Sequence, residues 1–567
     1  MRAGGVLAIL LVGLVLAATV AFCAPEALAS RPKPLAARGP IRITSDAEFT
    51  PENGVISGSG TFVDPYVIGG WAIETTGTPA IEIIGTTAYF VIATCLLKAE
   101  GSAAVRLQNV QNCPGIEGCR IKDSEIGVEV VGSTDVYVGA ATIIRNCEIG
   151  VRIADCGLVF VTQVSILSCA DGVVFSGTNA ECYVHNCFIH DVTHGVMNEE
   201  TLGTIGISAT MVWDAEVGFY LSGTISEAIV TNSTVADTNG DGILIEATDC
   251  FIAGCVVAYA GETGIHLHGL SSGDVHCNEA VSCLTGIAAM DCRSLLISYN
   301  IIKSNDLGML LQDTTDSMVN RNDFVDNSNQ ARDTTGANTW CYPGIHRGNY
   351  WSDHSGPDSD GDGVIDVPYT GDGFTDMYPL VEPVRYDVDT EGPEISDLEF
   401  NPTSPSPDQP VDVNVDVVDV EAGLIEVVLL FSTGAGWKEV PMVPTIPWDA
   451  HEPMEFYAAI PPQPAGTTVV FKVRARDAYG NTSESPEQSY TVAGGGPGPP
   501  PPGPGPGPSP GEGPTLALSP TLMLIIAIVV IVVIVAVVAA VLVRRRKAPT
   551  PTYPYYPPPP PPPPPSG

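Results

Sequence analysis

A four-residue pattern that recurs every 22 to 24 residues restricts the fold of this chain more than any other feature. It consists of a small residue, an apolar and usually β-branched residue, a variable residue and a mostly apolar residue. Its eleven copies begin at Ala80, Ala104, Gly127, Gly150, Gly172, Gly195, Gly218, Gly242, Gly264, Gly286 and Gly308. The two-residue alternation is that of a strand, and each unit is too short for a propeller blade. The pattern therefore predicts a solenoid of short parallel strands.

Stacking explains why such repeats come in series. One coil cannot bury its apolar residues alone, whereas coils stacked about 4.8 Å apart pair every strand and share one core. We expect an all-β fold, a parallel β-helix of about 12 coils over residues 41–383. About twelve coils give a rod on the order of 55–60 Å long.

The variable position of the repeat points outward and gives an internal test of the register. In four successive coils it reads Glu82, Arg106, Glu129 and Arg152. Coils stacked in register would place these opposite charges next to one another, which stabilises a sheet face and is not an active site.

The same position becomes mostly apolar in the later coils, where it includes Met197, Tyr220 and His266. Two interpretations remain open. A loop or the next domain covers this stripe, or the stripe is a ligand or partner face centred on these three residues.

Two flanking segments make a resemblance specific. They are Gly58-Ser-Gly-Thr-Phe-Val-Asp-Pro-Tyr-Val-Ile68 before the repeats and Gly348-Asn-Tyr-Trp-Ser-Asp353 after them. Together with the repeats, they resemble the NosD-type right-handed parallel β-helix family, in the form found on archaeal cell-surface proteins. The resemblance covers roughly residues 41–383. It implies a right-handed β-helix, often described as binding copper or carbohydrate, and does not identify a ligand.

An acidic loop carries the sharpest chemical motif. Asp358, Asp360, Asp362 and Asp366 occupy positions 1, 3, 5 and 9 of a loop with glycine at position 6, and the carbonyl of Val364 stands at position 7. Oxygens at this spacing surround a hard cation such as Ca²⁺. The motif resembles the calcium loops of EF-hands, dockerins and thrombospondin repeats.

The loop departs from the EF-hand pattern at position 12, where Tyr369 replaces the bidentate glutamate. The nearby Asp353, Asp372 and Asp376 are candidates to supply that charge. We expect a calcium-dependent structural clasp at the end of the β-helix. The alternative is a solvated acidic turn without a metal.

Cysteines fall at matching positions of neighbouring coils, as in the pair Cys147 and Cys169. Parallel Cβ vectors in stacked coils fit disulfide geometry poorly, so we expect a ladder of buried thiols. Three short-loop disulfides stay open as alternatives: Cys113–Cys119, Cys182–Cys187 and Cys250–Cys255. Because the family carries a copper label, a copper site built from Cys, His and Met is a further alternative; its candidates are His185, His190, His194, His266 and His268.

Right-handed β-helices include polysaccharide lyases and hydrolases, which need clustered carboxylates or a calcium–arginine pair on one outer face. Here the outward acids of the early coils alternate with arginines. Asp191, Asp214 and Glu216 are candidates from adjacent coils. The pattern favours a protein that is not an enzyme, with a membrane-tethered lyase or hydrolase as the alternative.

The 22- to 24-residue repeat is absent from residues 387–493, which show a different strand pattern. Strict alternation in Val411–Val417 and further strand-like runs predict a β-sandwich. Its segment Asp477-Ala-Tyr-Gly-Asn481 resembles the D-x-x-G-N segment of fibronectin-III- or immunoglobulin-like modules. Two glycosylation sequons begin at Asn232 and Asn481.

The two ends of the chain predict its location. Residues 1–29 have the charged, apolar and A-x-A regions of a signal peptide. A Gly/Pro-rich stalk, 494–521, precedes an uncharged apolar stretch at 522–543 that is long enough for a transmembrane helix. Arg544-Arg-Arg-Lys547 then places the tail, 544–567, in the cytoplasm. Its run Pro557–Pro565 suggests a ligand for a cytoplasmic adaptor that binds polyproline II helices, or else a low-complexity end.

The formal net charge of −40 argues against nucleic-acid binding. The resulting hypothesis is a single-pass cell-surface protein with its body outside the cell. It would bind extracellular polysaccharide or a surface protein without catalysis, stabilised by calcium. The alternatives are the tethered lyase or hydrolase, a copper-binding protein, and a structural component of the envelope.

Overall fold

The structure is a computed structural model that describes residues 35–198, 200–342, 344–385, 389–419, 423–444 and 453–493. The predicted signal peptide, stalk, transmembrane helix and cytoplasmic tail lie outside these residues. Within the described ranges, no helix is both long and apolar enough to cross a bilayer. The membrane helix at 522–543 therefore stays a prediction.

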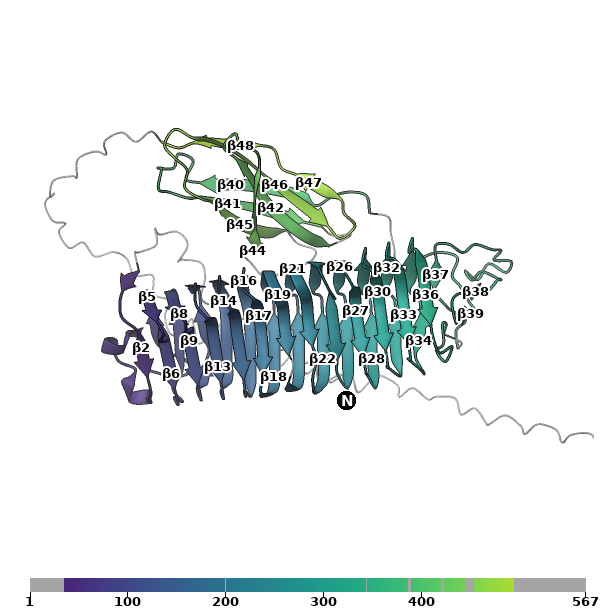
Figure 1. Ribbon diagram of the computed structural model, residues 1–567, viewed down its shortest axis with the longest axis horizontal. Helices are drawn as coiled ribbons and strands as arrows, with labels where there is room; N and C mark the ends of the chain where they lie inside the picture. The colour runs from purple at the N-terminus through teal and green to yellow at the C-terminus, as the bar shows by residue number, and fades with distance from the viewer. Residues whose placement is uncertain are drawn as a thin grey trace, which may run out of the picture. The chain divides into compact units, whose positions relative to one another are not determined.

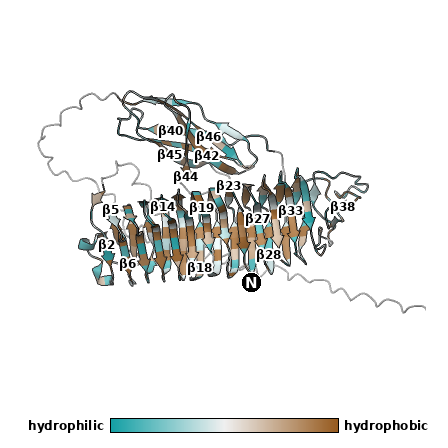
Figure 2. Ribbon diagram, in the orientation of Figure 1, coloured by the Kyte–Doolittle hydropathy of each residue, from teal (hydrophilic) through white to brown (hydrophobic). Residues whose placement is uncertain are grey.

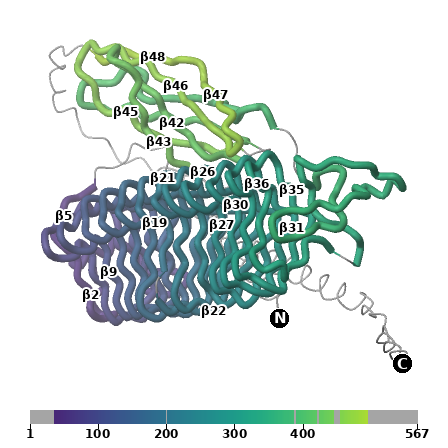
Figure 3. Tube along the Cα trace, turned by 45° about the vertical axis from the view of Figure 1, so that its right-hand side comes forward, coloured from purple at the N-terminus to yellow at the C-terminus, as the bar shows by residue number. Residues whose placement is uncertain are grey.

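A parallel β-helix of about 12 turns confirms the predicted fold (Figure 1). The coils lie one on the next from the purple end of the chain to the green part (Figure 3). Each coil contributes strands to three stacks, and neighbouring strands within a stack are parallel. Figure 2 shows hydrophobic and hydrophilic residues alternating in these strands.

The first stack contains β2 (Ile41–Ile43), β6 (Ile81–Ile84), β9 (Ala103–Gln108), β13 (Ile126–Val131), β15 (Ile149–Ala154), β17 (Asp171–Ser176), the second halves of β19 (Phe188–Asn198) and β21 (Met211–Leu221), β24 (Ile243–Glu246), β27 (Thr263–His268), β30 (Thr285–Met290), β33 (Leu307–Gln312) and β36 (Asn329–Asp333). The second stack contains β10 (Gln111–Cys113), the first halves of β14 (Thr134–Arg145) and β16 (Leu158–Leu167), β18 (Thr178–His185), β20 (Thr201–Ser208), β22 (Ile225–Thr231), β25 (Asp249–Ala253), β28 (Ser272–His276), β31 (Leu295–Ser298) and β34 (Met318–Asn320). The third stack contains β1 (Ala36–Ala37), β5 (Trp71–Thr76), β8 (Leu96–Glu100), β12 (Arg120–Lys122), the remaining halves of β14, β16, β19 and β21, β23 (Thr234–Thr238), β26 (Val256–Ala260), β29 (Glu279–Val281), β32 (Ile301–Lys303), β35 (Asp323–Val325) and β37 (Tyr350–Trp351).

The repeated glycines occupy a position with no room for a side chain. A Cβ added to Gly150 would lie 2.6 Å from the carbonyl oxygen of Gly172, the equivalent glycine of the next coil. Gly264 and Gly286 stand in the same relation, also at 2.6 Å. At these positions the close stacking of the coils therefore requires glycine, whereas the first two copies of the repeat carry alanine.

The predicted charge ladder is present in the first stack. The register pairs Glu82 with Arg106, Arg106 with Glu129, and Glu129 with Arg152. Arg106 Nε lies 2.6 Å from Glu129 Oε2, and Arg152 Nη1 lies 3.7 Å from Glu129 Oε1. Arg42 extends the ladder by one coil, with its Nε 2.7 Å from Glu82 Oε2.

A ladder of buried asparagines runs through the later coils and was not predicted. The side-chain amide of Asn278 donates to Asn300 at 3.0 Å, Asn300 donates to Asn322 at 2.9 Å, and Asn322 donates to Asn349 at 2.9 Å. All four are buried. Each ladder bond satisfies polar groups that would otherwise be left unpaired inside the protein.

The described cysteines form no disulfide, so the thiol prediction is confirmed and the three loop disulfides are absent. The thiols of Cys95 and Cys147 donate to the backbone carbonyl oxygens of Ala93 and Arg145, both at 3.5 Å. Burial raises the pKa of the Cys187 thiol to about 12. All but one of the described cysteines are buried, where a thiol packs as a small apolar side chain.

Caps close both ends of the solenoid. At the first end, η1 (Asp46–Glu48) and η2 (Pro51–Asn53) accompany a four-stranded sheet of β3 (Val55–Ser57), β4 (Tyr66–Gly69), β7 (Phe90–Ala93) and β11 (Gly115–Glu117). At the other end Trp340 stacks on Phe374, with ring centroids 3.8 Å apart, next to the hairpin of β38 (Tyr369–Thr370) and β39 (Thr375–Asp376). The two family-like segments thus belong to the ends of the solenoid.

The C-terminal region consists of antiparallel strands in two sheets. One contains β40 (Glu394–Asn401), β41 (Val411–Val418), β45 (Met454–Ile460) and β44 (Val443–Pro444). The other contains β43 (Lys438–Pro441), β42 (Leu424–Ser432), β46 (Thr468–Asp477), β47 (Thr482–Glu484) and β48 (Gln488–Thr491). Both sheets bury alternate residues, among them Val413, Phe456 and Phe471. This pattern is that of a sandwich.

Candidate functional site

A groove of about 420 Å³ lies at the corner where the third stack turns into the first, and we call it the corner groove. It is lined by Cys169, Asp191, Val192, Thr193, Asp214, Ala215, Glu216 and Asn239. Val192 and Ala215 are register partners in β19 and β21, so Asp191 and Asp214 hold equivalent positions in adjacent coils. The structure therefore brings together the three carboxylates that the sequence analysis considered for catalysis.

Backbone geometry turns these acids outward. Asp191 and Asp214 have φ values of 57° and 54°, the left-handed conformation that aspartate tolerates better than most residues. Their side chains and that of Glu216 are exposed. The inward residues on either side of the corner, such as Ile189 and Val196, are buried and anchor it to the core.

Few groups neutralise the groove. Within the described ranges, no lysine, arginine or histidine nitrogen lies within 4.0 Å of a carboxylate oxygen of Asp191, Asp214 or Glu216. The side-chain amide of Asn239 donates to Glu216 at 3.3 Å. Burial lowers the pKa of His190, and the charges of Asp214 and Asp191 oppose this shift only in part. The groove is thus a polar, negatively charged surface.

An imidazole and a phenol stand beside the groove. His194 Nδ1 lies 2.7 Å from Asp171 Oδ1 in the coil before it. The ring of Tyr220, in the coil after it, has its centroid 5.5 Å from that of His194. Tyr220 and Met197 are register partners, so two of the three predicted ligand-face residues lie in neighbouring coils beside the corner.

His266 lies two coils beyond Tyr220. Leu244 stands between them in the register, and His266 Nδ1 lies 2.8 Å from Asp241 Oδ2. Met197, Tyr220, Leu244 and His266 are half-exposed and follow one another coil by coil, whereas Val174 and Ala288 at the two ends of this run are buried. The predicted ligand face is therefore a short stripe of four coils, of which Met197 and Tyr220 lie beside the corner groove.

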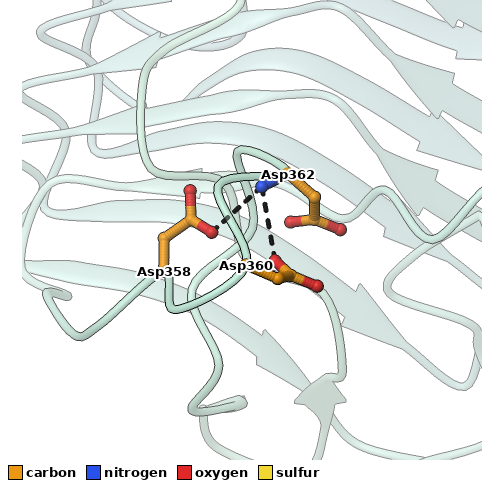
Figure 4. Close-up of side chains that lie close together, drawn as sticks. All are labelled: Asp358, Asp360 and Asp362. Carbon is orange, nitrogen blue, oxygen red and sulfur yellow. Dashed lines mark hydrogen bonds between the residues drawn. The ribbon is translucent and has the colours of Figure 1, made fainter.

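The acidic loop brings three of its predicted ligands together. One carboxylate oxygen from each of Asp358, Asp360 and Asp362 lies within 4.8 Å of the others (Figure 4). The backbone N–H of Asp362 donates to Asp358 at 3.1 Å and to Asp360 at 3.3 Å. Arg347 also reaches the loop, donating from Nη2 to the carbonyl oxygen of Asp362 at 2.8 Å.

The other predicted ligands of this loop stand apart from the three. Asp366 is outside the group, and its Oδ2 accepts a hydrogen bond from the N–H of Ser359 at 3.1 Å. Val364 is buried and pairs with Leu380 through a β-bridge. The carboxylate oxygens that converge are thus fewer than the sequence spacing predicted.

None of the acids considered for position 12 joins the group either. Asp376 is buried at the end of the asparagine ladder. Asp372 pairs with Arg332 at 3.2 Å, and Asp353 accepts a hydrogen bond from the Tyr369 hydroxyl at 3.3 Å. The expectation that one of them replaces the missing glutamate is not supported by these positions.

The two sequons differ in accessibility. Asn232 is exposed at a corner of the solenoid. The side-chain amide of Asn481 donates to Asp477 Oδ2 at 2.8 Å, so a glycan on that nitrogen would disturb this hydrogen bond. Asn232 is therefore the more accessible of the two sequons.

An aromatic stack on the second stack of strands escaped the sequence analysis. Tyr137, Phe160 and Tyr183 are register partners, with ring centroids 4.7 and 5.2 Å apart. Their spacing of 23 residues is the coil repeat and was the available signal. Phe160 is buried between the other two rings, so the stack stabilises this part of the solenoid.

Part of the chain matches a known protein family. Residues 201–356 match the family described as periplasmic copper-binding protein (NosD). No curated protein matches the chain. Among solved structures, the full-length tailspike protein 2 of an Escherichia coli O157:H7 bacteriophage aligns at 11% identity and a TM-score of 0.28, over 74% of this chain and 64% of that one. The enzymatically active domain of this tailspike gives a TM-score of 0.27 at 11% identity, over 74% of this chain and 72% of that one.

Proposed function

We propose that this chain, whose residues 201–356 form a NosD-type right-handed parallel β-helix, binds extracellular polysaccharide at the corner groove without cleaving it. The observation that carries the proposal is the meeting of Asp191, Asp214 and Glu216 in a groove of about 420 Å³ beside Tyr220. Sugar sites combine a concave surface that carries several hydrogen-bonding groups with an apolar surface. The corner groove supplies the hydrogen-bonding groups, and the ring of Tyr220 beside it supplies apolar surface.

The chemistry of the lining suits a neutral or amino sugar. Carboxylate oxygens accept hydrogen bonds from hydroxyl or ammonium groups, and the Thr193 hydroxyl is both donor and acceptor. Tyr220 offers an aromatic surface for the C–H face of a pyranose ring. Because coils repeat about every 4.8 Å, a polymer lying across them meets equivalent positions in succession. An anionic polysaccharide would be repelled by the three acids.

We propose calcium as the ion that stabilises the end of the solenoid, with Asp358, Asp360 and Asp362 as ligands and Val364 and Asp366 as further candidates. Three converging carboxylates are the donor type that Ca²⁺ prefers. Arg347 beside Asp362 lowers the local negative charge, so the expected affinity is modest and suits extracellular calcium concentrations.

The proposed location is the cell surface, with the body outside the cell. It depends on residues 1–29 and 522–543, which lie outside the described residues. A surface protein as partner, and an adaptor for Pro557–Pro565 in the cytoplasm, belong to the same proposal.

Binding is tested with the full chain and a panel of neutral, amino-sugar and anionic polysaccharides, with and without calcium. We expect neutral or amino-sugar polymers to bind, and the Asp191→Asn/Asp214→Asn and Tyr220→Ala variants to lose at least tenfold in affinity. Glu74→Gln, an exposed acid on β5, is the matched control and should bind as the unaltered chain does. Equal binding by all variants would place the ligand elsewhere.

Product release is measured in the same samples, because the enzyme alternative has a specific basis. Carboxylates in adjacent coils are separated by about one coil spacing, close to the 5–5.5 Å that retaining glycosidases use. New reducing ends, lost in the Asp214→Asn variant, would establish a hydrolase. Unsaturated ends would establish a lyase. Metal analysis of the purified chain tests the copper alternative. If no polysaccharide binds, no product is released and no copper is found, a structural role in the envelope is favoured.

A further inference from the structure

The two aspartates of the corner groove belong to a longer column of corner residues. The register of β19, β21, β23 and β26 places equivalent corner positions of four successive coils next to one another. These positions hold Asp191, Asp214, Asp237 and Tyr259. All four residues have φ between 54° and 58°, so the backbone turns outward in the same way in each coil. The column therefore presents three carboxylates and then an aromatic ring.

A cation of the chain itself already occupies the third carboxylate of this column. Arg476, on β46 of the sandwich, has its Nη2 2.5 Å from Asp237 Oδ2. Its guanidinium carbon lies 4.9 Å from the centroid of the Tyr259 ring. The Nε of the same side chain lies 3.6 Å from Glu426 Oε2 of the sandwich. One guanidinium group is thus held between a corner carboxylate and the aromatic side chain of the next coil.

The first two carboxylates of the column receive no such cation from the described part of the chain. Asp191 and Asp214 are exposed, and no lysine, arginine or histidine nitrogen described there lies within 4.0 Å of them. Among the other residues that line the corner groove, Glu216 adds a third carboxylate and none is basic. Burial lowers the pKa of the nearby His190, which disfavours its charged form. The groove thus offers the acceptors that hold Arg476 one coil further on, and leaves them accessible to a ligand.

We infer that the corner groove selects polysaccharides whose amino sugars carry free, protonated amino groups. The inference rests on the proposed polysaccharide binding and names the class of sugar. An ammonium group donates to a carboxylate as the guanidinium of Arg476 does, and such charge-assisted hydrogen bonds are stronger than those between neutral groups. Acetylation of the amino group removes this charge. Tyr220 would contact the apolar face of the sugar ring, as Tyr259 contacts the flat face of the guanidinium group.

The column also favours a polymer over a single sugar. One exposed ion pair contributes little in water. Asp191 and Asp214 hold equivalent positions in adjacent coils, about 4.8 Å apart, which is similar to the length of one pyranose unit. Successive rings can therefore reach successive carboxylates, and each further contact forms within a complex that already exists. Affinity should rise with the number of free amino groups in the chain of sugars.

Matched oligosaccharides test the inference on the full chain. Glucosamine and N-acetylglucosamine oligomers of equal length differ only in acetylation. Titration calorimetry at slightly acidic pH keeps the amino groups protonated and the aspartates ionised. We expect the glucosamine oligomer to bind at least tenfold more tightly, and to lose this advantage at high salt. Equal affinity of the two oligomers would overturn the inference and leave the proposed polysaccharide binding intact, whereas no binding of any polysaccharide would overturn both.

Two variants of the groove separate charge from ring contact. Asp191→Asn/Asp214→Asn should reduce the preference for the glucosamine oligomer to less than twofold, because it removes the charge and keeps hydrogen-bonding groups of the same size. Tyr220→Ala should weaken both oligomers and leave the ratio of their affinities unchanged. A preference that survives in the asparagine variant would overturn the inference.

A substitution outside the groove provides a test by gain of binding. Arg476→Gln should free Asp237 as a further carboxylate of the column and raise the affinity for the glucosamine oligomer at least threefold. Arg474→Gln is the matched control on the same strand, because Arg474 pairs with Glu426 and Glu439 of the sandwich. It should leave the affinity unchanged. The same affinity in the Arg476→Gln variant and in this control would contradict the role assigned to the column.

Discussion

The backbone N–H of Asn349 donates to Oδ2 of Asp376 at 2.7 Å, and this bond ends the asparagine ladder of the solenoid. The same oxygen accepts the indole N–H of Trp351 at 3.0 Å, while Oδ1 accepts the N–H of Tyr378 at 3.0 Å. A stack of coils leaves unpaired donors at its last member. Asp376 satisfies these donors from a segment that follows the repeats.

Replacing Asp376 tests this closure. Asp376→Ala leaves the buried N–H groups of Asn349 and Trp351 and the part-buried N–H of Tyr378 without this acceptor, and each buried donor left unpaired costs about 1–3 kcal/mol. Asp376→Asn keeps one carbonyl oxygen and should lose clearly less. The measurement is urea unfolding of the full chain, with Asp372→Ala, an exposed acid in the same segment, as control. Equal stability of the alanine and asparagine variants would contradict the assigned role.

The repeat glycines are tested by Gly150→Ala. Its Cβ would lie 2.6 Å from the carbonyl of Gly172 and 2.7 Å from Ile166 Cγ2, so the coils would have to move apart. Overpacking of this kind costs about 1–3 kcal/mol. Gly39→Ala is the control, because nothing lies within 4 Å of its added Cβ. A Gly150→Ala variant as stable as the control would show that stacking tolerates a side chain there.

Glu279 predicts a pH dependence of stability. Burial raises the pKa of this carboxyl to about 7, although Arg385, Tyr479 and Lys303 favour its charged form. The folded protein therefore binds the proton more tightly than the unfolded chain. The contribution to stability is fully present below pH 4.5 and is lost as pH rises through about 7. Glu279→Gln should flatten the dependence of the unfolding free energy on pH between these values. An unchanged slope would contradict this prediction.

Calcium bound at the acidic loop should raise the thermal stability of the solenoid. A ligand that binds only the folded state stabilises it by about 2.7 kcal/mol at 100 times its Kd. We expect a chelator to lower the melting temperature of the unaltered chain, and Asp360→Asn/Asp362→Asn to reduce or abolish this effect. Differential scanning calorimetry of the unaltered chain and this variant, with and without calcium, provides the measurement. A chelator effect that is the same in the loop variant and the unaltered chain would exclude the loop as its source.

Much of the fold could be predicted because the coil repeat is a local property that is copied along the chain. Register follows from the repeat length, so the alternating Glu82, Arg106 and Glu129 could be paired from their spacing alone. The same reasoning would have found the asparagine ladder, since Asn278, Asn300 and Asn322 are 22 residues apart.

The candidate sites were less predictable. The spacing of Asp358, Asp360 and Asp362 within one loop correctly indicated their convergence, because ligands so close in sequence share a local turn. It did not exclude Asp376 as a further ligand, since only the packed end of the solenoid shows that this carboxylate is buried elsewhere. The predicted ligand face included both Tyr220 and His266 because the two residues share a position in the repeat. In the structure Leu244 stands between them in the register.

The sequence by itself determined the parallel stacking, the charge ladder and the buried thiols of this protein, because each of them repeats with the coil. Only the tertiary structure decided which carboxylates share a groove at one corner, and that Asp389, Asp419 and Asp477 meet in the sandwich. The physical reason is that a periodic pattern specifies neighbours one coil away. The meeting of three segments 30 to 88 residues apart depends on how whole sheets fold over one another.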